Sequence, residues 1–372
     1  MIPLSAPDIT QREIEAVVEV MRSGVLSMGP KIRGFERMIA EFTGVSHAVA
    51  VSSGTCGLHL AVKAAGIKEG DEVITTPFSF ISSTNCILYE RAIPVFCDID
   101  PELLEMDPYE IRKKISKKTR AILAVDIFGH PCNITELRRI ASEYDLLLIE
   151  DACEALGSEH LGIKTGAGAD AAVFAFYPNK QITTGEGGCI ATNNEKLADI
   201  CRSLRNQGRA KGDDSLAYPI LGYNYRMNEI AAAIGCIQME RIDDIIDRRA
   251  GIAGYYNKKL RDIKGIKPLQ ISDKTTRMSW FVYTIRVDDH IDRDMLMNWL
   301  LSKGISCRSY FVPIHTQKFI KERLRVKEED HPNTVKAAMT HIALPFFNGL
   351  KESEIDYISD MLAKGVERCT CI

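Results

Sequence analysis

The chain has 372 residues, of which 45% are hydrophobic and 26% charged, and its formal net charge is −3. This is the composition of an ordinary globular protein, and the length suits about two domains. The charge provides no basic field that would attract nucleic acid or an anionic membrane, so we expect neither as a partner.

The N-terminal residues Met1–Ser5 show no basic stretch followed by an apolar one, so we expect no signal peptide. The longest apolar runs, such as residues 121–125, have the length of a strand and are too short to cross a bilayer. Eleven cysteines without CxxC pairs predict free thiols in a reducing compartment, and hence a cytoplasmic location. Cys369 and Cys371 lack further ligands, so we expect no metal site.

The first predicted helix begins at Thr10-Gln11-Arg12-Glu13, a capping box in front of an amphipathic pattern. Gly29-Pro30 then breaks the chain. A second helix is predicted because apolar residues recur at helical spacing, at Ile32, Phe35, Met38, Ile39 and Phe42.

From residue 47 onward, short apolar runs alternate with helical patterns. The predicted strands are His47–Val51, Glu72–Thr75, Ile93–Cys97, Arg120–Ile127, Leu146–Glu150, Ala171–Phe176 and Cys189–Thr192. The helical patterns between them include Leu58–Ala65, Pro108–Ile115 and Ile134–Tyr144. This alternation predicts an α/β fold, with a mostly parallel sheet covered by helices on both faces. Ligands of such sheets bind beyond the carboxyl ends of the strands.

A long helical pattern runs from Asn228 towards Leu260 and predicts a connector to a smaller α+β part. The elements predicted there are a strand at Trp280–Val287, a helix at Arg293–Lys303, a strand at Ser306–Phe311 and a last helix at Glu352–Val366. We place the boundary near residue 245, which gives a large domain of residues 1–245 and a small domain of residues 246–372.

The turn Ser52-Ser53-Gly54-Thr55-Cys56-Gly57 follows a predicted strand and opens the helix at Leu58. Glycines let a backbone approach an anion, hydroxyls add donors, and a helix N-terminus favours negative charge, so the turn is a candidate phosphate site. An ordinary β-α turn has the same composition and stays an alternative. The chain has no G-x-x-x-x-G-K-[ST] and no strand-linked G-x-G-x-x-G, which argues against nucleoside triphosphates and nicotinamide cofactors.

Asp151 stands at the carboxyl end of an apolar strand pattern, in the segment Leu147-Leu148-Ile149-Glu150-Asp151-Ala152. A charged side chain at the end of a buried strand needs a cationic partner. The protonated pyridine nitrogen of pyridoxal 5'-phosphate (PLP) is one such partner, and pairing with Asp keeps that cofactor an electron sink. The alternative is that Asp151 caps a helix.

Lys180 lies between the apolar run Phe174-Ala175-Phe176 and the glycine-rich turn Thr183–Gly188. A lysine in this position is held in place rather than solvated, and desolvation favours the neutral amine that Schiff-base chemistry needs. A lysine taken at random is a surface residue. The ordered set of phosphate turn, strand-end Asp and turn lysine favours the catalytic interpretation.

Further motifs complete the pattern. They are Gly29-Pro30 with Phe35-Glu36, Ser53-Gly54-Thr55, Gly70-Asp71-Glu72-Val73-Ile74, Glu150-Asp151-Ala152, Tyr177-Pro178-Asn179-Lys180, Gly185-Glu186-Gly187-Gly188, Gly222-Tyr223-Asn224-Tyr225-Arg226-Met227, Pro313-Ile314-His315 and Leu344-Pro345. Together they resemble the DegT–StrS family of PLP-dependent sugar aminotransferases, and the likeness runs nearly end to end. The resemblance implies the fold-type-I aspartate aminotransferase architecture, with a large sheet domain and a smaller C-terminal α+β domain.

The resemblance also implies roles for individual residues. Lys180 would hold the cofactor as an internal aldimine and then carry the proton, and Asp151 would pair with the pyridine nitrogen. Phe80 aligns with the aromatic residue that stacks on the cofactor ring. The phosphate would be held by Gly54, Thr55 and Cys56, and, across a homodimer interface, by Asn224 of the neighbouring subunit.

The chain departs from the family pattern at two cofactor positions. Glu154 stands where relatives usually have His or Gln near the cofactor's 3-hydroxyl, and its extra charge implies that it is protonated or turned away. Ala175 stands where many relatives have a phosphate-binding Ser, so one hydroxyl contact is lost. Phe80 and Phe176 could both be simple core residues, and for Phe176 we prefer that interpretation.

Arg226 and His315 are the candidates for substrate contacts. The arginine could meet a carboxylate or a diphosphate, and the histidine could donate to a sugar or phosphate oxygen. The alternative is an arginine in an interface ion pair and a packed histidine in a proline-rich turn.

The implied activity is transfer of an amino group from glutamate or glutamine, through PLP, to a nucleotide-diphosphate keto sugar in cell-surface polysaccharide or amino-sugar biosynthesis. The turn Thr183-Thr184-Gly185-Glu186 is more similar to relatives acting at C4 than at C3, which favours a 4-keto-6-deoxy sugar; cyclitol or aminoshikimate-type ketones are alternatives. The family's dehydratase branch replaces the lysine with His, so Lys180 argues against it. A non-catalytic regulatory homologue is disfavoured by the complete set of Lys180, Asp151 and Phe80.

Overall fold

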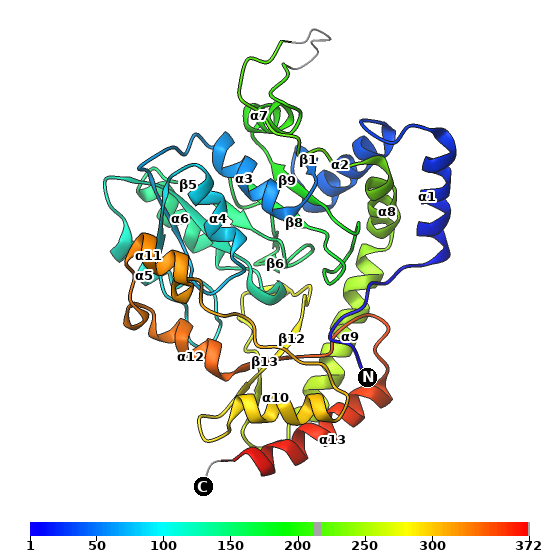
Figure 1. The fold of residues 1–372 in the computed structure, drawn as a ribbon, viewed down its shortest axis with the longest axis vertical. Helices are drawn as coiled ribbons and strands as arrows, with labels where there is room; N and C mark the ends of the chain where they lie inside the picture. Colours follow the sequence, from blue (N-terminus) through cyan, green and yellow to red (C-terminus); the bar gives the residue numbers. More distant parts are fainter. Residues whose placement is uncertain (211–216, 371–372) are drawn as a thin grey trace.

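In the computed structural model, which describes residues 1–210 and 217–370, a seven-stranded sheet forms the centre of the larger part of the chain (Figure 1). The strand order is β1-β9-β8-β5-β4-β2-β3. The bounds are β1 His47–Val51, β2 Glu72–Thr75, β3 Ile93–Phe96, β4 Thr119–Val125, β5 Leu147–Asp151, β8 Ala171–Ala175 and β9 Gly188–Thr192. Only β9 runs against the others in this sheet, so the predicted mostly parallel α/β fold is confirmed.

The strand registers bring the functional segments to one edge of the sheet. Asp151, the last residue of β5, pairs with Val125 of β4 and with Val173 of β8. Ala175 ends β8 and pairs with Gly188, the first residue of β9. Parallel strands end on the same side, so the residues that follow β4, β5 and β8 gather at this carboxyl edge.

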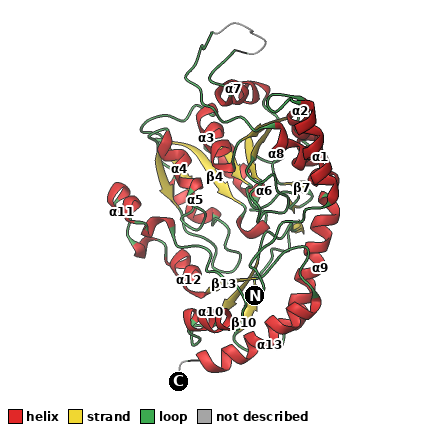
Figure 2. Ribbon diagram, turned by 45° about the vertical axis from the view of Figure 1, so that its right-hand side comes forward, coloured by secondary structure: helices red, strands yellow, loops and turns green. Residues whose placement is uncertain are grey.

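Alternate residues of each strand face opposite sides of the sheet, and both sides are covered by helices (Figures 1 and 2). On one side Val49, Leu123 and Ile149 share a core with α3 Gly54–Ala64, α4 Ser82–Tyr89 and α7 Glu195–Arg205. On the other side Ala50, Ile122 and Leu148 belong to the cores under α2 Pro30–Thr43, α5 Pro108–Lys114, α6 Ile134–Glu143 and α8 Glu229–Glu240. The N-terminal helix α1 Gln11–Ser23 packs on α8.

The helix α9 Ile242–Leu260 leads from the large sheet to the smaller part of the chain (Figure 2). A three-stranded antiparallel sheet forms that part, in the order β10-β12-β13. Its elements are β10 Ile266–Pro268, β12 Tyr283–Val287, α10 Arg293–Ser302, α11 Lys318–Leu324, α12 Pro332–Thr340, β13 His341–Leu344 and α13 Glu352–Cys369. A third small sheet joins β6 Glu159–His160 and β7 Ile163–Lys164 of the first part to β11 Thr275–Arg277.

Two predicted elements differ from the structure. The single helix expected from Asn228 to Leu260 is two helices, because the backbone leaves helical geometry at Arg241 (φ −112°, ψ 4°), whose guanidinium binds Asp8 and Glu13. No strand forms at Ser306–Phe311: Arg308 makes one isolated bridge to Ala343, and the chain then turns towards the large sheet. The predicted domain boundary at residue 245 falls inside α9.

The ten cysteines in the described residues form no disulfide, and Cys371 lies outside those residues. Cys369 is buried at the end of α13. No described helix combines the length and the apolar character that a membrane span requires.

Candidate active site

A cavity of about 480 Å³ lies at the carboxyl edge of the large sheet. Residues from both parts of the chain line it: Ser53, Gly54, Thr55, Leu58, Ser79, Phe80, Ser82, Val125, Asp151, Cys153, Glu154, Ala175, Tyr177, Asn179, Lys180, Glu186, Gly187, Phe281, Arg308, Tyr310 and Phe311. The predicted residues Gly54, Thr55, Phe80, Asp151, Glu154, Ala175 and Lys180 therefore meet at one cavity, where an α/β sheet binds its ligands.

The turn after β1 forms the start of α3 at one end of the cavity. Ser53 caps the helix, since its Oγ accepts from the Cys56 N–H at 3.2 Å. The Thr55 hydroxyl lies 2.7 Å from the Ser82 hydroxyl, so the turn presents hydroxyls beside a helix N-terminus. Cys56 does not line the cavity. Its N–H is already bonded to the Ser53 hydroxyl.

Gly54 and Ala175 are close neighbours across this end of the cavity. A Cβ atom on Gly54 would lie 2.7 Å from the Ala175 Cβ and 3.0 Å from the Cys153 Sγ. The turn can therefore approach β8 only without a side chain at position 54, and a larger residue at 175 would enter the same space. The N-terminus of α3, the nearby hydroxyls and the close backbone at Gly54 form a cradle that fits a phosphate group.

Asp151 is buried at the end of β5 with two donors on its carboxylate. The Ser83 Oγ donates to Oδ2 at 2.6 Å, and the Cys153 N–H donates to Oδ1 at 3.3 Å. Turn residues and no helix follow Asp151, so the alternative of a helix cap is wrong. The side chain is fixed at the cavity wall as an acceptor.

Lys180 points into the cavity between an acid and an aromatic ring. Its Nζ lies 3.5 Å from the Glu154 Oε1 and 4.0 Å from the centre of the Phe281 ring. The side chain is only 13% exposed, and the Lys180 N–H donates to the Tyr177 carbonyl at 2.9 Å. This lysine is therefore held in place and has little contact with solvent, as the sequence predicted.

Glu154 faces Lys180 instead of turning away from the cavity. Its second oxygen, Oε2, accepts from the Phe128 N–H at 2.9 Å. Burial raises the pKa of the Glu154 carboxyl above its ordinary value of 4.5, and the charge of Lys180 opposes that rise.

The two phenylalanines differ as the sequence suggested. Phe80 lines the cavity and is 59% exposed, so it is no core residue. Phe176 is fully buried and packs edge-on against Phe35, with ring centres 5.1 Å apart. Simple core packing is therefore confirmed for Phe176.

Besides Cys56, three predicted residues lie outside the cavity of their own chain: Asn224, Arg226 and His315. Asn224 is exposed and forms an isolated bridge with Asn206, whose Oδ1 also accepts from the Arg226 Nη1 at 3.0 Å. His315 is fully buried, with its ring 4.9 Å from that of His331 and no partner on either ring nitrogen in the described residues. Burial lowers the pKa of His315. His315 is therefore a packed histidine, which was the alternative to a substrate contact.

Several residues in or beside the cavity were not found from the sequence. Ser83 holds Asp151, Phe281 covers Lys180, and Arg308 and Tyr310 line the side of the cavity formed by the smaller part of the chain. Lys180 and Arg308 are the two cationic side chains among the described lining residues. No local motif marks Arg308 or Phe281, because their places depend on contacts between distant segments.

A buried acidic pair lies behind the strand that carries Asp151. Asp126, Cys132 and Glu150 bring their ligand atoms within 4.8 Å of one another, and the Asp126 N–H donates to the Asp151 carbonyl at 3.1 Å. Burial raises the pKa of Asp126 to about 6 and that of Glu150 well above 4.5. Burial and the mutual repulsion of two neighbouring carboxyls both disfavour their charged forms.

Comparison with known proteins identifies the class of enzyme. The model of the DegT/DnrJ/EryC1/StrS aminotransferase family matches residues 7–363, and the chain belongs to this family. GDP-perosamine synthase of Escherichia coli O157:H7 is 38% identical over 362 residues, which cover 97% of each chain. Spore coat polysaccharide biosynthesis protein SpsC of Bacillus subtilis is 34% identical and is matched over 95% of this chain and 94% of its own length.

A solved structure with the same fold is that of the putative sugar aminotransferase Spr1654 from Streptococcus pneumoniae in its PMP form. It superposes with a TM-score of 0.94 at 27% identity and covers 99% of this chain and 100% of its own. The chain is thus a PLP-dependent enzyme of a sugar aminotransferase family, as the sequence motifs predicted. The cradle at Gly54, the partly buried Lys180 and the buried Asp151 fit that cofactor.

We expect Glu154→Gln to change how stability depends on pH in the cofactor-free protein. Because the folded-state pKa lies above the unfolded value of 4.5, the folded chain binds more protons than the unfolded chain above that pH. Wild-type stability therefore loses a contribution as the pH rises above 4.5 and through the raised folded-state pKa of Glu154, and the glutamine variant lacks that loss. Its Tm should rise relative to wild type across this range.

The matched control is Glu186→Gln, which changes an exposed carboxyl at the same cavity. Its Tm should follow the wild-type curve. Parallel Tm curves for Glu154→Gln and wild type would show that burial does not disfavour the charged form of Glu154.

Proposed function

We propose that Lys180 binds the cofactor covalently and carries the proton of the transfer reaction, while Asp151 pairs with the cofactor's ring nitrogen. The observation that carries this proposal is the shared cavity, in which the Lys180 amine and the Asp151 carboxylate both stand at the carboxyl edge of the large sheet. When bound, PLP supplies an electron sink for the C–H bond that breaks beside the amino group. The protein's own part is orientation, exclusion of water and proton movement at the Lys180 Nζ.

The phosphate end of the site would be built by the turn at the start of α3. The Gly54 and Thr55 backbone and the Thr55 hydroxyl supply donors there, and the helix dipole favours the anion. Ala175 supplies space and no hydroxyl. Phe80, exposed at the cavity, would cover the cofactor ring.

Glu154 would keep Lys180 in place during the reaction. Its Oε1 faces the Lys180 Nζ, and its Oε2 is tied to the backbone at Phe128. The Glu154 carboxylate can hold the Lys180 amine on one side of the cavity while the charge of the amine changes. A glutamate in this position is therefore compatible with a lysine that takes up and releases protons.

The substrate that fits best is a nucleotide-diphosphate keto sugar, with glutamate or glutamine as amino donor. Arg308 and Tyr310 place a cation and a hydroxyl in the cavity wall formed by the smaller part of the chain, suited to an anionic substrate. A GDP-perosamine synthase is among the relatives, which favours a GDP-linked 4-keto-6-deoxy sugar and a role in cell-surface polysaccharide or amino-sugar biosynthesis. Lys180 argues against the dehydratase reaction.

We expect the purified enzyme to transfer the amino group of ¹⁵N-labelled glutamate to a GDP-linked 4-keto-6-deoxy sugar. Mass spectrometry of the nucleotide sugar should show the mass of the labelled amino sugar. The UDP- and dTDP-linked analogues test the nucleotide, amide-labelled glutamine tests the donor, and Asp151→Asn tests the dependence on the ring-nitrogen partner. Failure with every keto sugar of this panel, by protein that carries PLP, would contradict the proposed substrate class.

We further propose a two-fold homodimer with shared sites, in which Asn224 of each subunit reaches the phosphate end of the other subunit's cavity. In this chain Asn224 is exposed and lies outside its own cavity, on the segment 222–226 that precedes α8. Tyrosine and arginine, the residue types enriched at interfaces, flank it. Two-fold symmetry would then give each site one such segment from the neighbour.

Mixing two inactive variants tests this arrangement. A dimer of one Lys180→Ala subunit and one Asn224→Asp subunit would hold one site with both lesions and one site with neither. Verified heterodimers should therefore regain about half the wild-type activity, from one intact site of two. Heterodimers that stay as inactive as either parent would place Asn224 outside the neighbour's site.

A further inference from the structure

Arg249 is a buried arginine on α9 that lies outside the cavity. It is 3% exposed, and no carboxylate of the described residues lies within ion-pair distance of it. Burial lowers the pKa of its guanidinium to about 10. A buried cation that has no direct counter-ion is costly, so its hydrogen bonds define what it does in the fold.

Those hydrogen bonds go to the backbone that carries Phe281. Nε donates to the Trp280 carbonyl at 2.7 Å and Nη2 to the Phe281 carbonyl at 2.9 Å, while Nη1 donates to the Asn348 Oδ1 at 3.2 Å. Arg249 therefore holds two consecutive peptides in a planar, charge-assisted grip.

The peptides held by Arg249 have little freedom on their other side. A Cβ atom on Gly129 would lie 2.7 Å from the Phe281 nitrogen and 2.8 Å from the Trp280 nitrogen, and the Phe281 N–H donates to the Phe128 carbonyl at 3.1 Å. Trp280 has a φ of +53°, which a bulky residue adopts only when its surroundings enforce it. The Phe281 ring is thereby fixed 4.0 Å from the Lys180 Nζ.

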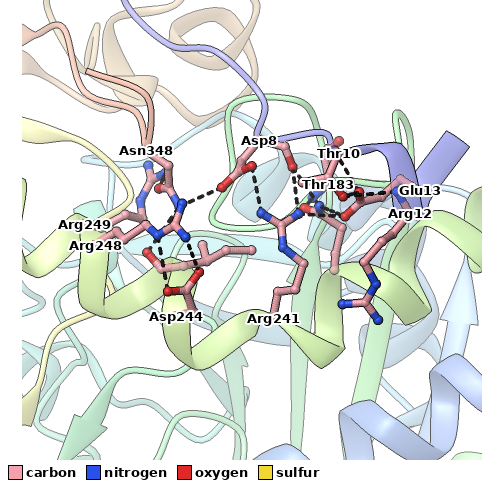
Figure 3. Close-up of polar contacts among 12 residues, drawn as sticks. Asp8, Thr10, Arg12, Glu13, Thr183, Arg241, Asp244, Arg248, Arg249 and Asn348 are labelled. Atoms are coloured by element: carbon pink, nitrogen blue, oxygen red, sulfur yellow. Dashed lines mark hydrogen bonds and ion pairs between the residues drawn. The ribbon is translucent and has the colours of Figure 1, made fainter. Parts of the chain in front are cut away.

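A polar network ties this grip to the N-terminal segment (Figure 3). The Asn348 Nδ2 donates to the Asp8 Oδ2 at 3.2 Å, and Asp8 pairs with Arg241 at 2.8 Å. Arg241 in turn pairs with Glu13 at 2.8 Å. The network joins α9 to residues far away in the sequence.

The same network also reaches the turn that follows Lys180. The Glu13 Oε1 also accepts from the Gln238 Nε2 at 2.7 Å, and the Gln238 Oε1 accepts from the Thr183 N–H at 3.2 Å. Thr183 stands three residues after Lys180. Both the ring that covers the lysine and the turn that carries it are thus anchored to one polar network.

We propose that Arg249 is a positioning residue for Lys180, which acts by holding the Phe281 ring against the lysine nitrogen. The role rests on the proposed function, because it concerns Lys180 as the residue that binds the cofactor. An aromatic face stabilises a nearby cation. Release of the ring should therefore disfavour the protonated form of the lysine-bound cofactor.

The test is a pH titration of the visible absorbance of the holoenzyme, which needs no turnover. Arg249→Met should lower the titration midpoint by about half a pH unit or more, the size expected when a cation–π contact is lost. Phe281→Leu should lower it by a similar amount, and the double variant should shift it no further than the larger single change. Arg248→Met is the matched control, because the neighbouring Arg248 is 55% exposed and pairs with Asp244, and its midpoint should equal that of wild type.

A folded, PLP-loaded Arg249→Met protein with the wild-type midpoint would overturn the proposal, as would shifts that add in the double variant. If Arg249→Met does not fold, Arg249→Lys keeps a buried cation with fewer donors. The titration midpoint of Arg249→Lys must then lie below that of wild type. The double variant Arg249→Lys with Phe281→Leu must have a midpoint no lower than the lower of the two single variants. If the visible absorbance band of Lys180→Ala were the same as that of the wild-type enzyme, that result would instead contradict the proposed function.

Discussion

The ion pair between Lys180 and Glu154 is the interaction around which the cavity is organised. Both side chains have little contact with water. An isolated charge in such a place would be strongly destabilised. Each is therefore held by further contacts: Glu154 by the Phe128 N–H, and Lys180 by the Phe281 ring. A lysine restrained in this way can meet a cofactor at a defined position and exchange protons there.

The rest of the fold supplies what this pair requires. The parallel strands end together, which places Asp151 and the turn of Lys180 at the same edge. Helix α3 starts at that edge with a glycine that lets its backbone approach β8. The smaller part of the chain closes the cavity with Phe281, Arg308 and Tyr310, so that both parts contribute to one site.

Elements and site residues that are marked by a short stretch of sequence could be predicted. Apolar runs predicted the central strands, and Asp151 and Lys180 were found because each follows such a run within a few residues. Contacts between distant segments could not be predicted: Arg308 was assigned to a strand that does not form, and Arg249 lies more than thirty residues before the peptides it holds. The break at Arg241 was missed for the same reason, because its partners Asp8 and Glu13 belong to the N-terminal segment.

The most direct test of the central claim is to locate the covalently bound cofactor. Borohydride reduction of the PLP-loaded enzyme, followed by digestion and mass spectrometry, identifies the modified lysine. If Lys180 binds the cofactor, the added mass lies on the peptide that contains Lys180 and is absent in Lys180→Ala. An adduct on a different lysine of the wild-type enzyme, or one that persists in folded Lys180→Ala, would contradict it.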